Sequence, residues 1–158
     1  NGSNNAYGFD ANNHAANKLR VEFDNCTVKG CDRGFYLGEN VKFYYKNLII
    51  EGADMALRVL DGAVVYGSGL FLDFSKTIHT SLSYCVHMAG TSTFLCYDKP
   101  EIIMGGANLP RDFFHDTDAT GTKTVWHEGL IVDDRGNTPT TSKNGTFTDS
   151  TEINAVAL

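Results

Sequence analysis

The sequence predicts a chain built almost entirely of β-strands, and its composition and its periodicity are the observations that predict this class. Glycine is frequent, with 16 residues, and proline is rare, with 3, in a chain of 158 residues of which 42% are hydrophobic. This balance favours a sizeable core made of many short strands joined by tight turns. No stretch longer than a turn or two has the periodicity of a helix.

A Gly-x-Asp triplet returns at a constant interval along the first half of the chain. It begins at residues 8, 30 and 52, as GFD, GCD and GAD, and fails at residue 74, where phenylalanine replaces glycine. Glycine can take the positive φ that a sharp bend needs, and the aspartate can accept hydrogen bonds from nearby backbone N–H groups. We therefore expect a corner between strands at each triplet.

Three short segments of alternating apolar residues fill each repeat. The first kind covers 20–23, 40–43 and 63–66; the second covers 26–28, 48–50 and 70–72; the third covers 35–37 and 57–59. Strands this short cannot bury an apolar face alone, but stacked repeats can. The sequence therefore predicts a parallel β-helix with about 22 residues in each rung, a period typical of solenoids. Loops of varying length are expected between the first and second segments.

Stacking also predicts columns of side chains, one residue from each rung. The expected inward columns are Val21, Val41 and Val64; Phe23, Phe43 and Tyr66; Cys26, Leu48 and Leu70; Val28, Ile50 and Leu72; Phe35 and Leu57; and Leu37 and Val59. The expected outward columns place Glu22 above Lys42, Lys29 above Glu51, and Thr27 with Ile49 and Phe71. The last column is apolar, so we expect it to be covered by neighbouring copies of the chain.

The pattern changes after Pro100, where long polar loops surround one clear strand, TVWHEGLIV. We expect a boundary between about residues 98 and 110. The predicted organisation is β-helix rungs over 1–97 and a β-rich cap or terminal region over 98–158.

Charge and motif spacing disfavour several classes of partner. The net charge is −6 and the 13 basic residues are scattered, which argues against nucleic acid. No segment approaches the roughly 20 apolar residues that cross a bilayer, so no membrane insertion is expected. The four cysteines match no zinc spacing and are expected to be free thiols. One short stretch holds His115, Asp116, Asp118, His127 and Glu128 but matches no metal motif, so we expect no metal and no cofactor.

Stacked carboxyl groups are the only candidates for catalysis. Two carboxyl groups hydrolyse a polysaccharide at separations of roughly 5 to 5.5 Å with retention or roughly 6.5 to 9.5 Å with inversion, and adjacent strands lie about 4.8 Å apart. The candidates are Glu51 above Asp73 and Asp32 above Asp54. Turn chemistry alone accounts for an aspartate after glycine, and Lys29 beside Glu51 would hold that carboxyl group ionised, which suits an acid catalyst poorly.

Aromatic side chains give a candidate for binding. Tyr36, Tyr44, Tyr45 and Trp126 are expected at outward or loop positions. An exposed ring offers a flat apolar face that can stack on a sugar. These four residues are therefore the predicted glycan-binding residues.

The run FDNCTVKGCDRGFYLGENVKFYYKNLIIEGADMALRVLDGAVVYGSG resembles the right-handed β-helix of pectate-lyase-like proteins, and among them the spike and fibre proteins of tailed bacteriophages. The resemblance covers about residues 5–97 and rests on the rung pattern. It implies a trimeric spike that binds, and in many members cleaves, a bacterial surface polysaccharide. Such spikes usually have many more rungs, which implies that this chain is a C-terminal portion.

The expected function is therefore to bind a bacterial surface glycan as part of a homotrimeric tail spike of a virion, with Thr27, Ile49 and Phe71 at the trimer interface. Two alternatives stay open. One is a polysaccharide lyase or glycoside hydrolase that acts in a groove along the β-helix. The other is a bacterial adhesin or structural solenoid that is secreted or held at the cell surface.

Overall fold

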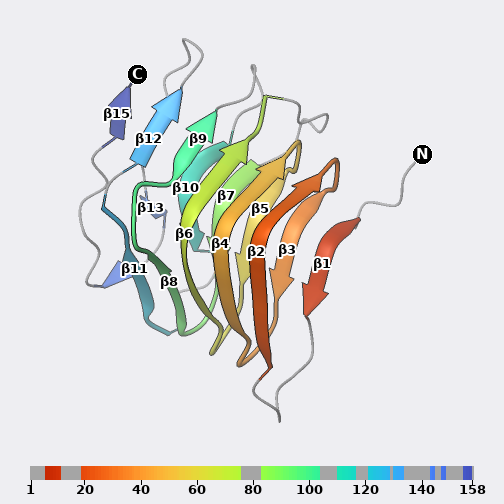
Figure 1. Cartoon of the computed structure of the whole chain (residues 1–158). Coiled ribbons are helices and arrows are strands. Elements are labelled where there is room, and N and C mark those ends of the chain that lie inside the picture. The colour runs from red at the N-terminus through yellow and green to blue at the C-terminus, as the bar shows by residue number, and fades with distance from the viewer. Residues whose placement is uncertain are drawn as a thin grey trace.

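The computed structural model describes residues 6–11, 19–75, 83–103, 110–116, 121–128, 130–133, 143–144, 147–148 and 155–157. Within these ranges every regular element is a β-strand (Figure 1). The all-β class predicted from composition is confirmed.

The strands form two sheets in which every pairing is parallel. The first sheet has the order β1 (Tyr7–Ala11), β3 (Arg33–Leu37), β5 (Met55–Val59), β7 (Ser83–Met88), β10 (Pro110–Asp116) and β13 (Lys143–Asn144). The second sheet contains β2 (Arg20–Lys29), β4 (Lys42–Glu51), β6 (Val64–Asp73), β8 (Ser92–Cys96), β9 (Glu101–Ile103), β11 (Lys123–Trp126), β12 (Leu130–Asp133), β14 (Phe147–Thr148) and β15 (Ala155–Ala157). Over its first six strands the chain alternates between the sheets, and Figure 1 shows β2, β4 and β6 in front of β3 and β5.

The period of the repeat sets the register of β2, β4 and β6. Arg20 pairs with Lys42, and Lys42 pairs with Val64. In the second half of these strands and in the first sheet, the predicted columns are confirmed: Cys26, Leu48 and Leu70; Val28, Ile50 and Leu72; Phe35 and Leu57; and Leu37 and Val59.

The first half of these strands corrects the predicted register. Val21 pairs with Phe43, which in turn pairs with Val65, and Phe23 pairs with Tyr45, which in turn pairs with Gly67. The expected columns of Val21, Val41 and Val64 and of Phe23, Phe43 and Tyr66 are therefore wrong. Each strand runs unbroken through the segment that was expected to be a loop of varying length, so the period of the repeat stays constant.

A single-residue bend makes these unbroken strands possible. Asn25, Asn47 and Gly69 stand at equivalent positions and have φ values of 53°, 52° and 69°. Asparagine and glycine tolerate this left-handed region better than other residues. The Asn47 Nδ2 amide donates to Asn25 Oδ1 over 2.8 Å, which links the bends of adjacent strands.

Two of the three Gly-x-Asp triplets form corners. Gly30 and Gly52 have φ values of 64° and 68°, as predicted. Gly8 instead lies inside β1, and a Cβ placed on it would stand 2.7 Å from the carbonyl oxygen of Gly34. The first triplet is therefore part of a strand. Tyr7 of β1 stands beside Arg33 of β3, an interval longer than the 22 residues from Arg33 to Met55 of β5.

The core lies between the two sheets and is lined by apolar side chains from both. Phe35 and Leu57 of the first sheet and Phe43 and Leu48 of the second have no exposed surface. The rings of Phe35 and Phe43 have centroids 4.9 Å apart. Packing across this layer is the main source of stability, since each buried apolar side chain of this size contributes about 1.5 to 3 kcal/mol.

Both of the predicted charge pairs involve side chains on the outer face of the second sheet. The predicted pair of Lys29 and Glu51 is confirmed, with Nζ and Oε2 3.0 Å apart. The predicted pair of Glu22 and Lys42 is wrong, because Glu22 stands beside Tyr44 and forms an ion pair with Arg20 of its own strand.

The second sheet continues past Pro100, although its strands become shorter. β6 pairs with β8 through residues 64–67 and with β9 through residues 71–73, and β9 in turn pairs with β12. The described strands on both sides of the predicted boundary at 98–110 thus belong to the same two sheets. The separate role of 98–158 stays a prediction.

The observed columns predict unequal costs for two substitutions in β4. Leu48→Ala should lower the free energy of unfolding by about 2 to 5 kcal/mol, because the Leu48 side chain is fully buried and its removal leaves a cavity. Lys42→Ala should cost less than about 1 kcal/mol, because Lys42 is exposed. Urea titration followed by circular dichroism measures both values, and equal midpoints for the two variants would contradict the register.

Candidate functional site

Two of the four predicted aromatic residues lie in one column on the outer face of the second sheet. Tyr44 of β4 pairs with Tyr66 of β6, Tyr66 pairs with Leu95 of β8, and Leu95 pairs with Trp126 of β11. All four side chains are partly buried and alternate with inward residues along their strands. We call Tyr44, Tyr66, Leu95 and Trp126 the aromatic column.

Contacts with neighbouring rings and with one guanidinium hold the side chains at both ends of this column in place. The rings of Tyr44 and Tyr66 are stacked, with centroids 5.3 Å apart and planes at 14°. The guanidinium of Arg20 lies 4.6 Å from the centroid of the Tyr44 ring, a cation–π contact. At the other end the Tyr97 ring, with 56% of the residue exposed, lies 5.8 Å from the Trp126 ring. Four neighbouring strands place these rings along about 14 Å of the sheet.

Tyr36 lies on the other sheet, in β3. Its ring is partly buried between the Arg58 guanidinium, 4.9 Å from its centroid, and the Tyr7 ring at 5.3 Å. It faces away from the core as predicted, but the aromatic column belongs to the second sheet.

Tyr45 corrects the prediction, because it lies in the core with only 4% of the residue exposed. β4 runs on through the segment that was expected to be a loop, so the alternation that turns Phe43 inward turns Tyr45 inward as well. Gly67 beside it provides the space, since a Cβ there would lie 2.4 Å from the Tyr45 ring. Burial, followed by interactions with Cys96, raises the pKa of Tyr45.

Sequence reasoning missed Tyr66 and Tyr97 as members of this surface. Alignment of the segment 63–66 with 40–43 predicts a core position for Tyr66. A strictly constant period places Tyr66 beside Tyr44, so the signal was present in the sequence. Tyr97 follows the end of β8 at a corner, where no periodicity predicts the direction of a side chain.

The candidate catalytic carboxyl groups of Glu51, Asp73 and Asp32 have structural contacts. Glu51 pairs with Asp73 in register as predicted, but Glu51 forms an ion pair with Lys29. Asp73 is buried, and its Oδ1 accepts a hydrogen bond from the Ser75 N–H over 2.8 Å.

The other two carboxyl groups lie at the corners. Asp32 Oδ2 accepts a hydrogen bond from the Ala6 N–H over 3.0 Å, and the Asp54 N–H donates to the Asp32 carbonyl oxygen over 3.0 Å. Contacts of this kind stabilise turns and corners.

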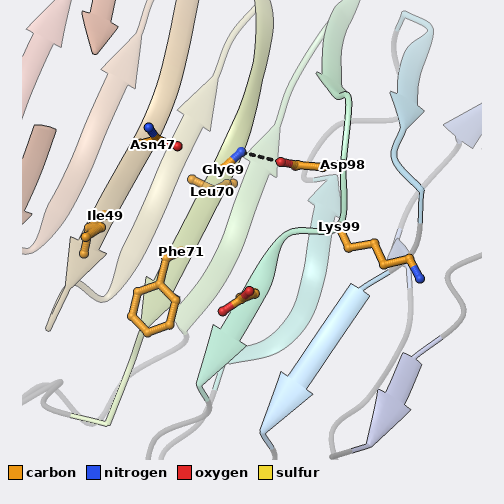
Figure 2. A pocket seen from close by; sticks show the side chains of 8 residues that line it. Asn47, Ile49, Gly69, Leu70, Phe71, Asp98 and Lys99 are labelled. Atoms are coloured by element: carbon orange, nitrogen blue, oxygen red, sulfur yellow. Dashed lines mark hydrogen bonds between the residues drawn. The ribbon is translucent and has the colours of Figure 1, made fainter. Parts of the chain in front are cut away.

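A groove of about 350 Å³ lies on the outer face of β4 and β6, at and beyond their bends (Figure 2). The predicted outward column of Thr27, Ile49 and Phe71 is confirmed in register. Thr27 is exposed, whereas Ile49 and Phe71 are partly buried and form the apolar part of the groove. The remaining lining residues are Asn47, Gly69, Leu70, Asp98, Lys99 and Glu101.

Asp98 fixes the corner between β8 and β9 to the bend of β6. Its Oδ2 accepts the Gly69 N–H over 2.6 Å, which Figure 2 marks with a dashed line. Its Oδ1 accepts a hydrogen bond from the Cys96 thiol over 3.0 Å. Burial, followed by this hydrogen bond, raises the pKa of Cys96 to about 12. The same corner carries Tyr97, so Asp98 helps to hold that ring beside Trp126.

The residues considered for a metal do not come together in the described part of the chain. Asp118 and the side chains of His115 and Asp116 lie outside the described residues, His127 is buried, and Glu128 is exposed. Among the described side chains, no three histidine, cysteine, aspartate or glutamate residues form a group that could hold a metal ion. The described residues also include no helix long and apolar enough to span a bilayer.

Comparison of the chain with protein-family models, with curated proteins and with solved structures finds no match.

The contacts of Asp98 predict a difference in reactivity between cysteines. At pH 8 Cys96 should resist iodoacetamide, because it is fully buried and a pKa of about 12 leaves roughly one thiolate in ten thousand. Cys26, which is partly buried in β2, should react faster. Asp98→Ala should speed the reaction of Cys96 by releasing the corner, and Asp98→Asn, which keeps one acceptor, should speed it less. Peptide mass spectrometry measures these rates, and equal rates for Cys26 and Cys96 in the unmodified chain would contradict the assignment.

Proposed function

We propose that this chain is the glycan-binding portion of a trimeric bacteriophage tail spike and that it is folded as a right-handed parallel β-helix. The fold proposal is supported by the alternation of the chain between two parallel sheets and by the constant sequence offset between successive long strands. The hand follows from a general rule, since crossovers between parallel strands of one sheet are right-handed in about 98% of cases.

The observation that carries the function is the aromatic column. A sugar ring has an apolar face that stacks on an aromatic ring, and a polysaccharide presents such faces repeatedly. Tyr44, Tyr66 and Trp126 present rings on one face, and their strands fix the spacing between them. Rings held by a sheet lose little conformational freedom on binding, which favours affinity.

Binding is the chemistry that we propose, because three of the carboxyl groups considered for catalysis, those of Glu51, Asp73 and Asp32, have structural contacts. Glu51 is paired with Lys29, and Asp73 accepts a backbone N–H. These contacts, all among described residues, favour binding over a lyase or hydrolase.

The trimer is supported by the apolar column of Thr27, Ile49 and Phe71. Phe71 and Ile49 lie in a groove on the outer face, where a neighbouring copy would bury them. Three parallel copies would present the aromatic column three times, so weak single contacts would combine through a high effective concentration. The bacterial surface polysaccharide and the virion are the proposed setting for this arrangement.

Substitution of the column should weaken glycan binding. Trp126→Ala and Tyr66→Ala should each lower affinity by about two- to twelvefold, because each removes a stacking surface worth about 0.5 to 1.5 kcal/mol. Tyr36→Ala is the matched control on the other sheet and should leave affinity unchanged. Isothermal titration calorimetry against a panel of bacterial capsule and O-antigen polysaccharides measures the effect. Equal losses for Tyr36→Ala and Tyr66→Ala, or no binding to any member of the panel, would count against the proposed site.

Charge placed in the apolar column should prevent assembly. Ile49→Asp combined with Phe71→Asp should convert a trimer to a monomer, because three charges at each position would be buried at the interface. Lys42→Asp, at an exposed position of β4, is the control and should remain trimeric. Light scattering at micromolar concentration measures the mass, and an unmodified chain that is already monomeric would remove the proposal of a trimer.

A further inference from the structure

The inward columns of the second sheet become less buried at β2. Val21, Phe23, Cys26 and Val28 of β2 are all partly buried. Their neighbours in β4 are buried, with 0% exposed for Phe43, 4% for Tyr45, 0% for Leu48 and 2% for Ile50. Each comparison lies within one column and on one face of the sheet. The difference is that β4 has a strand on both sides, whereas β2 pairs with β4 alone among the described strands.

The backbone of β2 also has a row of groups on its open side. The Lys42 N–H donates to the carbonyl oxygen of Leu19, and the Val64 N–H donates to that of Val41, each over 2.8 Å. Arg20 is equivalent to Lys42, and alternate residues of a parallel strand direct their N–H groups to the same neighbour. The N–H groups of Arg20 and Glu22 therefore point toward the side on which no described strand lies.

This edge lacks three of the features that prevent strand addition. Proline, a bulge and a charged side chain directed inward each protect an edge strand. β2 has no proline, pairs with β4 without a bulge over Arg20–Asp24 and Cys26–Lys29, and directs only apolar side chains inward. Its charged side chains, among them Arg20, Glu22 and Lys29, are exposed on the outer face and are not directed inward.

We propose that β2 is an interaction surface for one further extended segment, which adds in parallel orientation and repeats the chemistry of β4. The segment carries apolar side chains at the four positions that face Val21, Phe23, Cys26 and Val28. At the position that faces Asn25 it carries asparagine or glycine, because Asn25, Asn47 and Gly69 all take a positive φ at this bend. The proposal continues the pairing of β6, β4 and β2 by one strand and depends on neither the glycan nor the trimer.

A peptide with the sequence of residues 39–51 is the probe, because β4 pairs in parallel on both of its sides. Fluorescence anisotropy of the labelled peptide should report saturable binding to the full chain. The control peptide has the same composition, but each of its four inward apolar residues is exchanged with the outward residue that follows it. It should bind at least about tenfold more weakly, because the exchange places lysine and glutamate at the inward positions of Tyr45 and Ile50.

Two variants of the chain locate the binding at β2. Glu22→Pro removes an N–H that β4 does not use, so it should weaken peptide binding at least about tenfold and leave the fold intact. Glu22→Ala keeps that N–H and is the matched control, with affinity expected within about twofold of the unmodified chain. Equal peptide affinity for Glu22→Pro and Glu22→Ala would overturn the proposal.

Hydrogen exchange of the unmodified chain tests the edge without any variant. The amides of Arg20 and Glu22 should exchange rapidly in the chain alone and become protected when the peptide is added. Protection in the chain alone that does not depend on concentration would mean that the chain covers its own edge. Protection that rises with protein concentration would mean that a second copy occupies it. Either result would overturn the proposed partner.

Discussion

The bend at Asn25, Asn47 and Gly69 is the constraint on which the rest of the second sheet depends. A single residue of positive φ turns the chain without adding length, so β2, β4 and β6 keep the same period and stay in register on both sides of the bend. A longer loop would have let the register differ between the two halves. The equal period places Tyr44 beside Tyr66 on the outer face and Tyr45 over Gly67 in the core.

A corner that carries Asp98 takes the place of this bend after β6, where two shorter strands follow the long ones. After β6 the sheet continues as two shorter strands, β8 and β9, which are joined by a corner at residues 97–100. The carboxylate of Asp98 accepts the Gly69 N–H and so continues the side-chain hydrogen bonding that Asn47 begins with Asn25. The corner also forms part of the groove beside Phe71. One charged side chain thus connects the regular strands to the surface features that follow them.

The sequence was sufficient where a strict period governs the side chains. The columns from Cys26 to Leu70 and from Val28 to Leu72 could be read directly, because apolar residues recur there at a constant interval. The sequence does not determine the register of the first half of the same strands. Glycine stands at the inward position 67, where β4 has an aromatic residue, and valine stands at the outward position 64. The apolar pattern therefore fits two alignments that differ by one residue, and a shift of one residue exchanges the inward and outward faces.

The candidate site could likewise be predicted only where a strict period governs the direction of the side chains. Alternation predicts a surface position for Tyr44, whereas only the likeness of its segment to a loop predicts one for Tyr45. The sequence predicts Trp126 as a single outward ring, and its place in a column with Tyr44 depends on pairings through Leu95 that cross repeats of unequal length. No sequence period connects those positions. The contact of Tyr97 with Trp126 depends on the corner that Asp98 holds, and a corner has no periodic signal.

Stacked strands also determine how binding and stability are connected. When each strand contacts only its neighbours, stability is close to a sum of contributions from neighbouring pairs, and the end of the stack is its weakest part. The partly buried side chains of β2 mark such an end. The aromatic column lies across β4, β6, β8 and β11, so a ligand that contacts all of its rings would need all four strands in place. Such a ligand binds only the stacked state and therefore stabilises the pairing of these strands. A strand added at β2 would cover inward side chains at the end of the same sheet. Strand addition would therefore act on the inner face and ligand binding on the outer face, and both would stabilise the same register of the strands.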